Sequence, residues 1–166
     1  MKKHLLIALA SLLILINNPI VAQDQTAKTK LNQIELIKQF VGKFKHEIGK
    51  DTVIIWDCKP FGNGYELSYT FSAKGKVYYD IKDLWGFDIK SDTWVVFSIE
   101  NRENYKVFYQ KFITPSEMIV DRVYILGNED KQESYSMEVI SPDKFAGYLK
   151  LEGKKKLIHI MTRIKQ

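Results

Sequence analysis

The sequence has almost no cysteine, since Cys58 is the single one in 166 residues. A lone cysteine cannot form an intramolecular disulfide, so the hydrophobic core must hold the fold unaided. A nucleophilic thiol needs a neighbour that stabilises the thiolate, and the sequence places none beside Cys58. We therefore interpret Cys58 as a small buried apolar residue.

Catalytic signatures are also missing. The chain has no Gly-x-Ser-x-Gly elbow, phosphate loop or dinucleotide fingerprint, and His46-Glu47 is not followed by the second histidine of the helical zinc motif. After His4 only His46 and His159 remain, too few for a histidine metal cluster. We expect no catalytic chemistry, cofactor or metal. An enzyme assembled in space stays an alternative, and it would place a carboxylate or His159 in a cavity with a strongly shifted pKa.

A strong charge of one sign is absent. The formal net charge of +5 is small for this length, and the basic residues are spread along the chain. Nucleic-acid binding needs a concentrated basic face, so we exclude a nucleic-acid partner. The three lysines at 154–156 lie between two strand-like segments, and we interpret them as a solvated turn.

No apolar run is long enough to span a bilayer, which takes about 20 residues. The longest one, residues 5–16, follows a basic start and precedes the helix-breaking residues 17–19 and Ala22. This pattern predicts a signal peptide over 1–22 that is cleaved after Ala22. We expect a flexible leader over 23–30, one domain over 31–166, and a periplasmic or secreted mature protein without a transmembrane segment.

Aromatic residues are absent before position 40. Just before that position, the spacing of the apolar residues is that of a helix. Apolar residues fall on one face of a short helix, at Leu31, Ile34, Ile37 and Val41. Gly42 can end this helix, because glycine is common after the last helical turn. The sequence predicts no other helix in the mature chain.

After Gly42 the apolar period changes to two, and turn signals recur about every twelve residues. In the segment 65–72, for example, one face is apolar and the other carries glutamate, serine and threonine; the apolar face consists of Tyr65, Leu67, Tyr69 and Phe71. Such a strand has one dry side and one wet side. The turn signals together delimit about ten strands.

Short connections join all of these strands, so consecutive strands should pair as antiparallel neighbours. An open meander would leave two bare edges, which closure into a barrel removes. We therefore predict an all-β fold, an up-and-down antiparallel meander closed into a roughly ten-stranded barrel, preceded by one short N-terminal helix. A β-sandwich is the main alternative, but it usually needs longer Greek-key connections.

Three short glycine-aromatic motifs carry a family resemblance: Gly-Lys-Phe at 42–44, Gly-Asn-Gly-Tyr at 62–65 and Leu-Trp-Gly-Phe-Asp at 84–88. With the short helix and the strand order, they make the mature chain similar to the calycin superfamily, especially to secreted bacterial lipocalin-like β-barrel proteins of unassigned function. The first strand of that group usually opens with Gly-x-Trp, and Phe44 stands here in place of the tryptophan. The resemblance implies a lipocalin-like barrel.

The resemblance also has implications for two late residues. In lipocalins an arginine near the C-terminus packs across the first-strand tryptophan, which implies that Arg163 packs on Phe44. Some related barrels bind haem through a histidine on a late strand. The apolar face formed by isoleucines 158, 160 and 164 would turn His159 the other way, so we favour a structural role for His159.

Arg122 and Tyr124 suggest a ligand contact. They lie two residues apart on a strand face that is otherwise apolar, and they could hold a carboxylate at the end of a hydrophobic cavity. The Arg-x-Tyr pair also resembles the carboxylate clamp of fatty-acid-binding barrels, which carry it on the final strand. The opposite face of this strand is equally apolar, so parity leaves open which face points inward.

Aromatic side chains, including Tyr65 and Trp85, could line a cavity in which hydroxyl groups orient an apolar or amphipathic ligand. A ten-stranded barrel encloses more room than an eight-stranded one, which favours such a cavity over a filled interior. A filled barrel would instead serve as a cell-envelope module that meets a protein or glycan through an exposed apolar patch. Besides Arg122 and Tyr124, the candidate ligand-binding residues are Trp56, Tyr69, Phe71, Tyr79, Trp94 and Tyr109.

Overall fold

The computed structural model describes residues 30–101, 104–125, 134–151 and 153–165, without the side chains of residues 122–125. The predicted signal peptide and all but the last residue of the predicted leader lie outside these ranges. Residues Leu31–Gln166 form one compact unit, and the following description concerns that unit.

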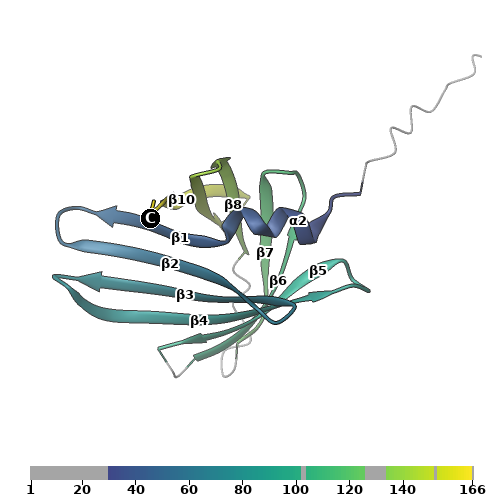
Figure 1. Cartoon of the computed structure of the whole chain (residues 1–166), viewed down its shortest axis with the longest axis horizontal. Coiled ribbons are helices and arrows are strands. Elements are labelled where there is room, and N and C mark those ends of the chain that lie inside the picture. Colours follow the sequence, from purple (N-terminus) through teal and green to yellow (C-terminus); the bar gives the residue numbers. More distant parts are fainter. Residues whose placement is uncertain (1–29, 102–103, 126–133, 152, 166) are drawn as a thin grey trace, which may run out of the picture. The chain divides into compact units, whose positions relative to one another are not determined.

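A short helical segment precedes ten strands (Figure 1), which confirms the predicted all-β class. The segment consists of α2 (Gln33–Ile37) and the 3-10 turn η1 (Lys38–Phe40), and neither is long and apolar enough to cross a membrane. The strands are β1 (Gly42–Ile48), β2 (Thr52–Phe61), β3 (Gly64–Ala73), β4 (Lys76–Asp88), β5 (Thr93–Glu100), β6 (Asn104–Phe112), β7 (Glu117–Ile125), β8 (Ser134–Ser141), β9 (Lys144–Leu151) and β10 (Lys154–Arg163).

The ten strands form one closed antiparallel barrel. Each strand pairs with the next one along the chain, and β10 pairs back onto β1, where Phe44 lies opposite Arg163. The predicted up-and-down meander is therefore correct, and the sandwich alternative is wrong. Closure leaves no open sheet edge, which is the physical reason for the arrangement.

Side chains alternate along each strand, so every second one points into the barrel. On β5, for example, Trp94, Val96 and Ser98 are buried, whereas Phe97 between them is 42% exposed. The same period of two on the paired strands brings inward-facing residues into rows across the barrel wall. The row through Ser98 contains Asp83 on β4 and Lys106 on β6.

The helical segment, which we call the helical plug, packs across one end of the barrel. Its start is capped by Asn32, whose side chain accepts a hydrogen bond from the Glu35 amide (3.2 Å). Five α-helical residues are too few to be stable alone, so tertiary packing must hold them. Ile37 and Phe40 supply that packing, because both are fully buried in the core.

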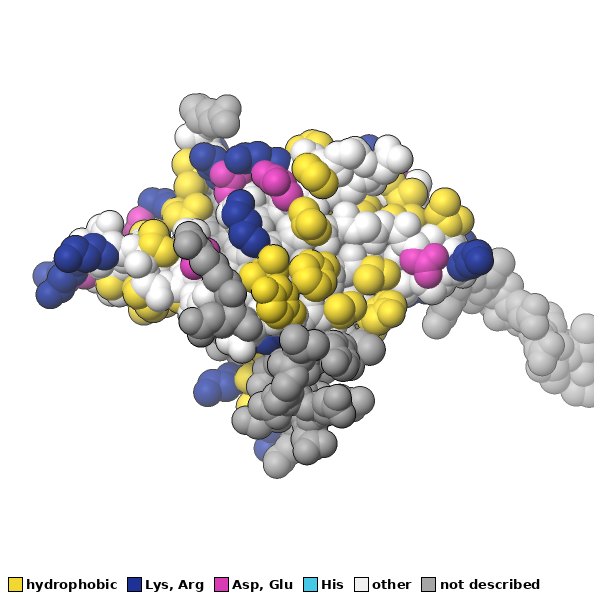
Figure 2. Space-filling model, turned by 90° about the horizontal axis from the view of Figure 1, so that it is seen from below, with side chains coloured by type: hydrophobic (Ala, Val, Ile, Leu, Met, Phe, Trp, Pro, Cys, Tyr) yellow, Lys and Arg dark blue, Asp and Glu magenta, His cyan; other side chains and the backbone are white. Residues whose placement is uncertain are grey.

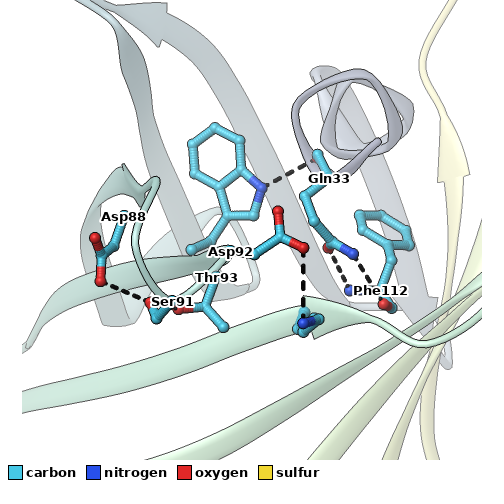
Figure 3. Close-up of polar contacts among 8 residues, drawn as sticks. Gln33, Asp88, Ser91, Asp92, Thr93 and Phe112 are labelled. Atoms are coloured by element: carbon cyan, nitrogen blue, oxygen red, sulfur yellow. Dashed lines mark hydrogen bonds and ion pairs between the residues drawn. The ribbon is translucent and has the colours of Figure 1, made fainter. Parts of the chain in front are cut away.

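Buried hydrogen bonds fix the helical plug to the barrel wall (Figure 3). The Gln33 amide donates to the Phe112 carbonyl (3.0 Å) and accepts from the Phe112 amide (2.8 Å). The indole of Trp94 donates to the Gln33 carbonyl (3.2 Å). Outside the view of Figure 3, the indole of Trp56 donates to the Phe40 carbonyl (2.9 Å). These bonds satisfy polar groups that burial would otherwise leave unpaired.

Aromatic rings fill the barrel beside the helical plug. Phe40 contacts Phe112 with ring centroids 5.9 Å apart and Phe145 with centroids 5.0 Å apart, and Phe145 continues to Phe44 at 4.9 Å. All four rings are at most 1% exposed. This end of the barrel is therefore a packed core, and any interior space lies beyond it.

Candidate functional site

The remaining interior of the barrel holds a cavity of about 450 Å³. Side chains or backbone of every strand from β2 to β10 line it, and most of the lining is apolar or aromatic. Its volume falls within the range of small-molecule sites, roughly 300 to 1,000 Å³. The barrel is thus filled at the helical plug and hollow beyond it.

Four of the candidate ligand-binding residues line this cavity: Trp56, Tyr69, Phe71 and Tyr79. Trp94 lies instead in the packed end, 1% exposed, with its indole bonded to the Gln33 carbonyl. Tyr109 lies outside the cavity and is 39% exposed, because strand alternation turns its neighbours Phe108 and Gln110 inward. Trp85, which the sequence also suggested as a lining residue, does line the cavity.

The proposed clamp residues Arg122 and Tyr124 have backbones on β7, opposite Phe108 and Val107 of β6. Their side chains lie outside the described part of the protein. Earlier on the same strand, Val120 lines the cavity. The sequence left open which face of β7 points inward, and at Val120 the structure answers this. The carboxylate clamp stays a prediction.

Six residues of the cavity wall carry buried side-chain atoms that have no hydrogen-bond partner among the described residues: Asp83 Oδ1, Trp85 Nε1, Ser98 Oγ, Gln110 Nε2, Ser136 Oγ and His159 Nε2. Asp83, Ser98, Gln110 and Ser136 were not among the sequence candidates. Strand parity could have found Asp83, which lies two residues before Trp85 on the same strand face. Buried polar atoms without partners are unusual in proteins, and here they gather in the wall of the cavity.

Two charged cavity residues on β5 and β6 neutralise each other. Lys106 forms an ion pair with Glu100, and both side chains are mostly buried, at 13% and 11% exposed. Such a pair is tolerated inside a protein because each charge compensates the other. It leaves Asp83 as the described carboxylate of the cavity wall without an ion-pair partner.

Burial raises the pKa of Asp83 to about 6. The Ser98 hydroxyl and the Trp85 indole lie near this carboxyl without reaching hydrogen-bond geometry, and they oppose the shift. The charge of Glu100 raises the pKa further, whereas Lys106 lowers it. The ionised form is penalised because the dry aromatic surroundings solvate it poorly.

His159 lies in the cavity wall, so the expectation that it faces away from the interior is wrong. Ile158 and Ile160 are 47% and 36% exposed, so these isoleucines do not form a buried face that turns His159 outward. A β-bulge between Leu157 and His159 shifts the register there. Bulges of this kind change which way the following side chains point.

A hydrogen bond and a glycine hold the His159 ring. Nδ1 lies 3.2 Å from the Tyr69 hydroxyl, and Gly147 on β9 faces the other side of the ring. A Cβ atom on Gly147 would lie 2.5 Å from His159 Nε2, so the ring occupies space that only glycine leaves free. Burial, assisted by the charge of His46, lowers the pKa of His159 to about 4. The ring is therefore neutral near pH 7.

The chemistry available to these groups is limited. Asp83 could exchange a proton near neutral pH, but Cys58 is no nucleophile, because burial raises the pKa of its thiol to about 12. Its 1% exposure agrees with the buried apolar role expected from the sequence. Over the ranges that the structure describes, no three histidine, cysteine or carboxylate side chains gather as metal ligands.

The outer wall carries exposed apolar side chains as well. Leu84 on β4, Phe97 on β5 and Val107 on β6 form one cross-strand row, and the Phe97 ring stacks on Tyr105 with centroids 6.1 Å apart. Leu84 is 48% exposed and Phe97 is 42% exposed. Figure 2 views the barrel from the side of β4, and hydrophobic side chains gather there among charged ones.

Comparison with protein-family models and with curated proteins finds no match to this chain. The closed ten-stranded antiparallel barrel is consistent with a lipocalin-like fold. Function must therefore be inferred from the cavity and its lining.

Proposed function

We propose that this protein is an exported lipocalin-like barrel of the calycin superfamily that binds a small apolar or amphipathic molecule in its interior and has no catalytic activity. One observation supports this most: a cavity of about 450 Å³ with a mainly apolar lining and a few buried polar atoms that have no partner. An apolar group that enters such a cavity is removed from water, which favours binding.

The lining suits an aromatic or alkyl group. Trp56 contacts Tyr69 and Trp85 edge to face, with centroids 6.1 and 5.8 Å apart, so the wall presents rigid ring surfaces. Rings of this kind offer a large contact area with little loss of side-chain entropy.

Export is part of the proposal. The basic start, the apolar segment 5–16 and the small residue Ala22 support it, and an exported mature protein would lie in the periplasm or outside the cell. Mass spectrometry of the protein recovered from its own host should give a chain that starts at Gln23. A chain that keeps Met1 would contradict the signal peptide.

Native mass spectrometry of the mature protein, purified gently from its host, tests the ligand. We expect an additional mass bound in a one-to-one ratio, which denaturing extraction should release as a small molecule. A protein that carries no ligand and gains none from a lipid extract would contradict interior binding.

A pair of tryptophan substitutions locates the binding. Val120→Trp adds bulk to the cavity wall and should abolish the additional mass, whereas Phe97→Trp adds the same ring to the outer face and should keep it. Cooperative thermal unfolding of both variants would show that they are folded. Equal ligand content in the two variants would place the ligand outside the cavity.

The exposed row on β4, β5 and β6 favours a second candidate, an envelope module that meets a protein or glycan through its outer wall. Phe97→Lys would place a charge in that row while leaving the cavity lining unchanged. Loss of association with an envelope component, with the interior ligand still bound, would support this second role.

A further inference from the structure

Asp83 is the charged residue of the described cavity wall that has no ion-pair partner. Glu100 and Lys106 pair with each other, and His159 is neutral near pH 7. Oδ1 of Asp83 is inaccessible and has no hydrogen-bond partner within the described residues. A buried carboxylate in this state lacks the counter-charge that buried ions usually have.

Lys106 cannot form an ion pair with Asp83 without breaking its ion pair with Glu100. Asp83 pairs with Ser98 across β4 and β5, and Ser98 pairs with Lys106 across β5 and β6, so two strand spacings of about 4.8 Å separate the backbones of Asp83 and Lys106. The lysine amine turns along its own side of the wall to Glu100. Asp83 lines the cavity next to the short side chain of Ser98.

The surroundings of Asp83 suit a cation. Trp85 lies two residues further on the same strand face, and its ring lies 5.8 Å from that of Trp56. Indole faces attract ammonium groups, more strongly when water is excluded. A carboxylate next to aromatic rings therefore offers both a counter-ion and π-faces to one positively charged group.

Resting on the interior-binding role proposed above, we propose that the cavity selects amphipathic amines: the ligand carries a protonated amino group that pairs with Asp83, and its apolar part lies against the aromatic wall. A carboxylate ligand would instead face Asp83 with a like charge.

Three probes with the same alkyl chain and different head groups test this preference: octylammonium, octanol and octanoate. Each is titrated below its micelle concentration at pH 7.5 and followed by isothermal calorimetry. We expect octylammonium to bind at least about 10-fold more tightly than octanol, because a hydrogen bond between two charged groups is stronger than one to a neutral hydroxyl. Octanoate should bind most weakly.

The variant Asp83→Asn isolates the charge while keeping the shape of the side chain. It should weaken octylammonium binding by at least about 10-fold and change octanol binding by less than about 2-fold. Glu47→Gln removes one negative charge from an exposed site on β1 and should leave both affinities unchanged. Thermal unfolding checks that both variants are folded, and the comparison of head groups on the unchanged protein requires no variant.

The outcomes separate this inference from the proposed function. Equal affinity for octylammonium and octanol, or equal losses on Asp83→Asn, would overturn the amine preference and leave interior binding intact. Tightest binding of octanoate would also overturn it and would favour the clamp of Arg122 and Tyr124. If none of the probes binds and the host protein carries no ligand, both the inference and the interior-binding role fail.

Discussion

The guanidinium of Arg163 lies over the ring of Phe44, with Cζ 4.3 Å from the ring centroid. The same side chain donates hydrogen bonds to the carbonyls of Val41 (2.8 Å), Gln39 (3.2 Å) and Pro142 (3.1 Å). One residue of the last strand thus joins the first strand, the helical plug and the turn between β8 and β9. The family resemblance implied this contact, and the structure confirms it.

Replacement of Arg163 by alanine should destabilise the barrel by about 2 to 4 kcal/mol. The variant loses the cation–π contact, worth about 0.5 to 2 kcal/mol, and leaves three carbonyls without their donors. Urea unfolding followed by circular dichroism measures the change. Arg163→Lys keeps the charge but not the planar fork, so it should recover less than half of the loss. A stability equal to that of the unchanged protein would show that the contact does not hold the β1–β10 junction.

Gln33→Ala should lower the free energy of unfolding by about 1 to 3 kcal/mol, because it leaves the amide and the carbonyl of Phe112 unpaired in the core. Gln39→Ala is the matched control. Its amide donates to the carbonyls of Leu36 and Pro115 nearer the surface, and its loss should cost less than about 1 kcal/mol. Equal effects of the two substitutions in urea unfolding would contradict a special role for Gln33 in fixing the helical plug.

Gly147→Ala should destabilise the protein by about 1 to 3 kcal/mol, because the new methyl group would meet the His159 ring at 2.5 Å. Gly86→Ala is the control, since a Cβ there would meet nothing within 4 Å. Combining Gly147→Ala with His159→Ala removes the clash, so the effects of the two substitutions should be smaller together than their sum. Strict additivity in thermal unfolding would rule out the steric explanation.

Asp83→Asn should stabilise the protein at pH 8 by about 1 to 3 kcal/mol. The pKa of Asp83 rises from 3.8 to about 6 on folding, so the ionised side chain opposes folding above pH 6. The penalty disappears as the pH falls from about 6 to about 4, and the two proteins should then be equally stable. Glu100, Lys106 and the neutral Cys58 thiol face the same region and are unchanged in this comparison. A difference independent of pH, measured by urea unfolding, would contradict this titration.

His159→Asn should show the opposite dependence. The pKa of His159 falls from 6.5 to about 4 on folding, so the unchanged protein loses stability as the pH drops between these values. The variant lacks this loss and should gain about 1 to 3 kcal/mol relative to the unchanged protein between pH 7 and pH 4. A constant difference over this range would mean that His159 titrates normally in the folded state.

The barrel could be predicted from the sequence because its signals are local. The period of two after Gly42, the regular turns and the short connections suffice for the strand number, the order and the closure. The short helix was also correctly predicted from its apolar spacing. Phe44 and Arg163 were paired by resemblance, and closure of the barrel brings them together.

The inward faces were harder to predict, because both sides of several strands are apolar. Ile158 and Ile160 are exposed, so hydrophobicity could not show that His159 points into the cavity. The bulge before His159 also has no distinct signal in the sequence. Asp83 was overlooked for a related reason: a carboxylate within an alternating strand is normally solvated, and only the closed barrel buries it.

The helical plug and the packed rings beside it occupy one end of the barrel. If the interior binds a ligand as proposed, that ligand cannot pass through this end while the plug is in place. Exchange of the ligand would then take place away from the plug.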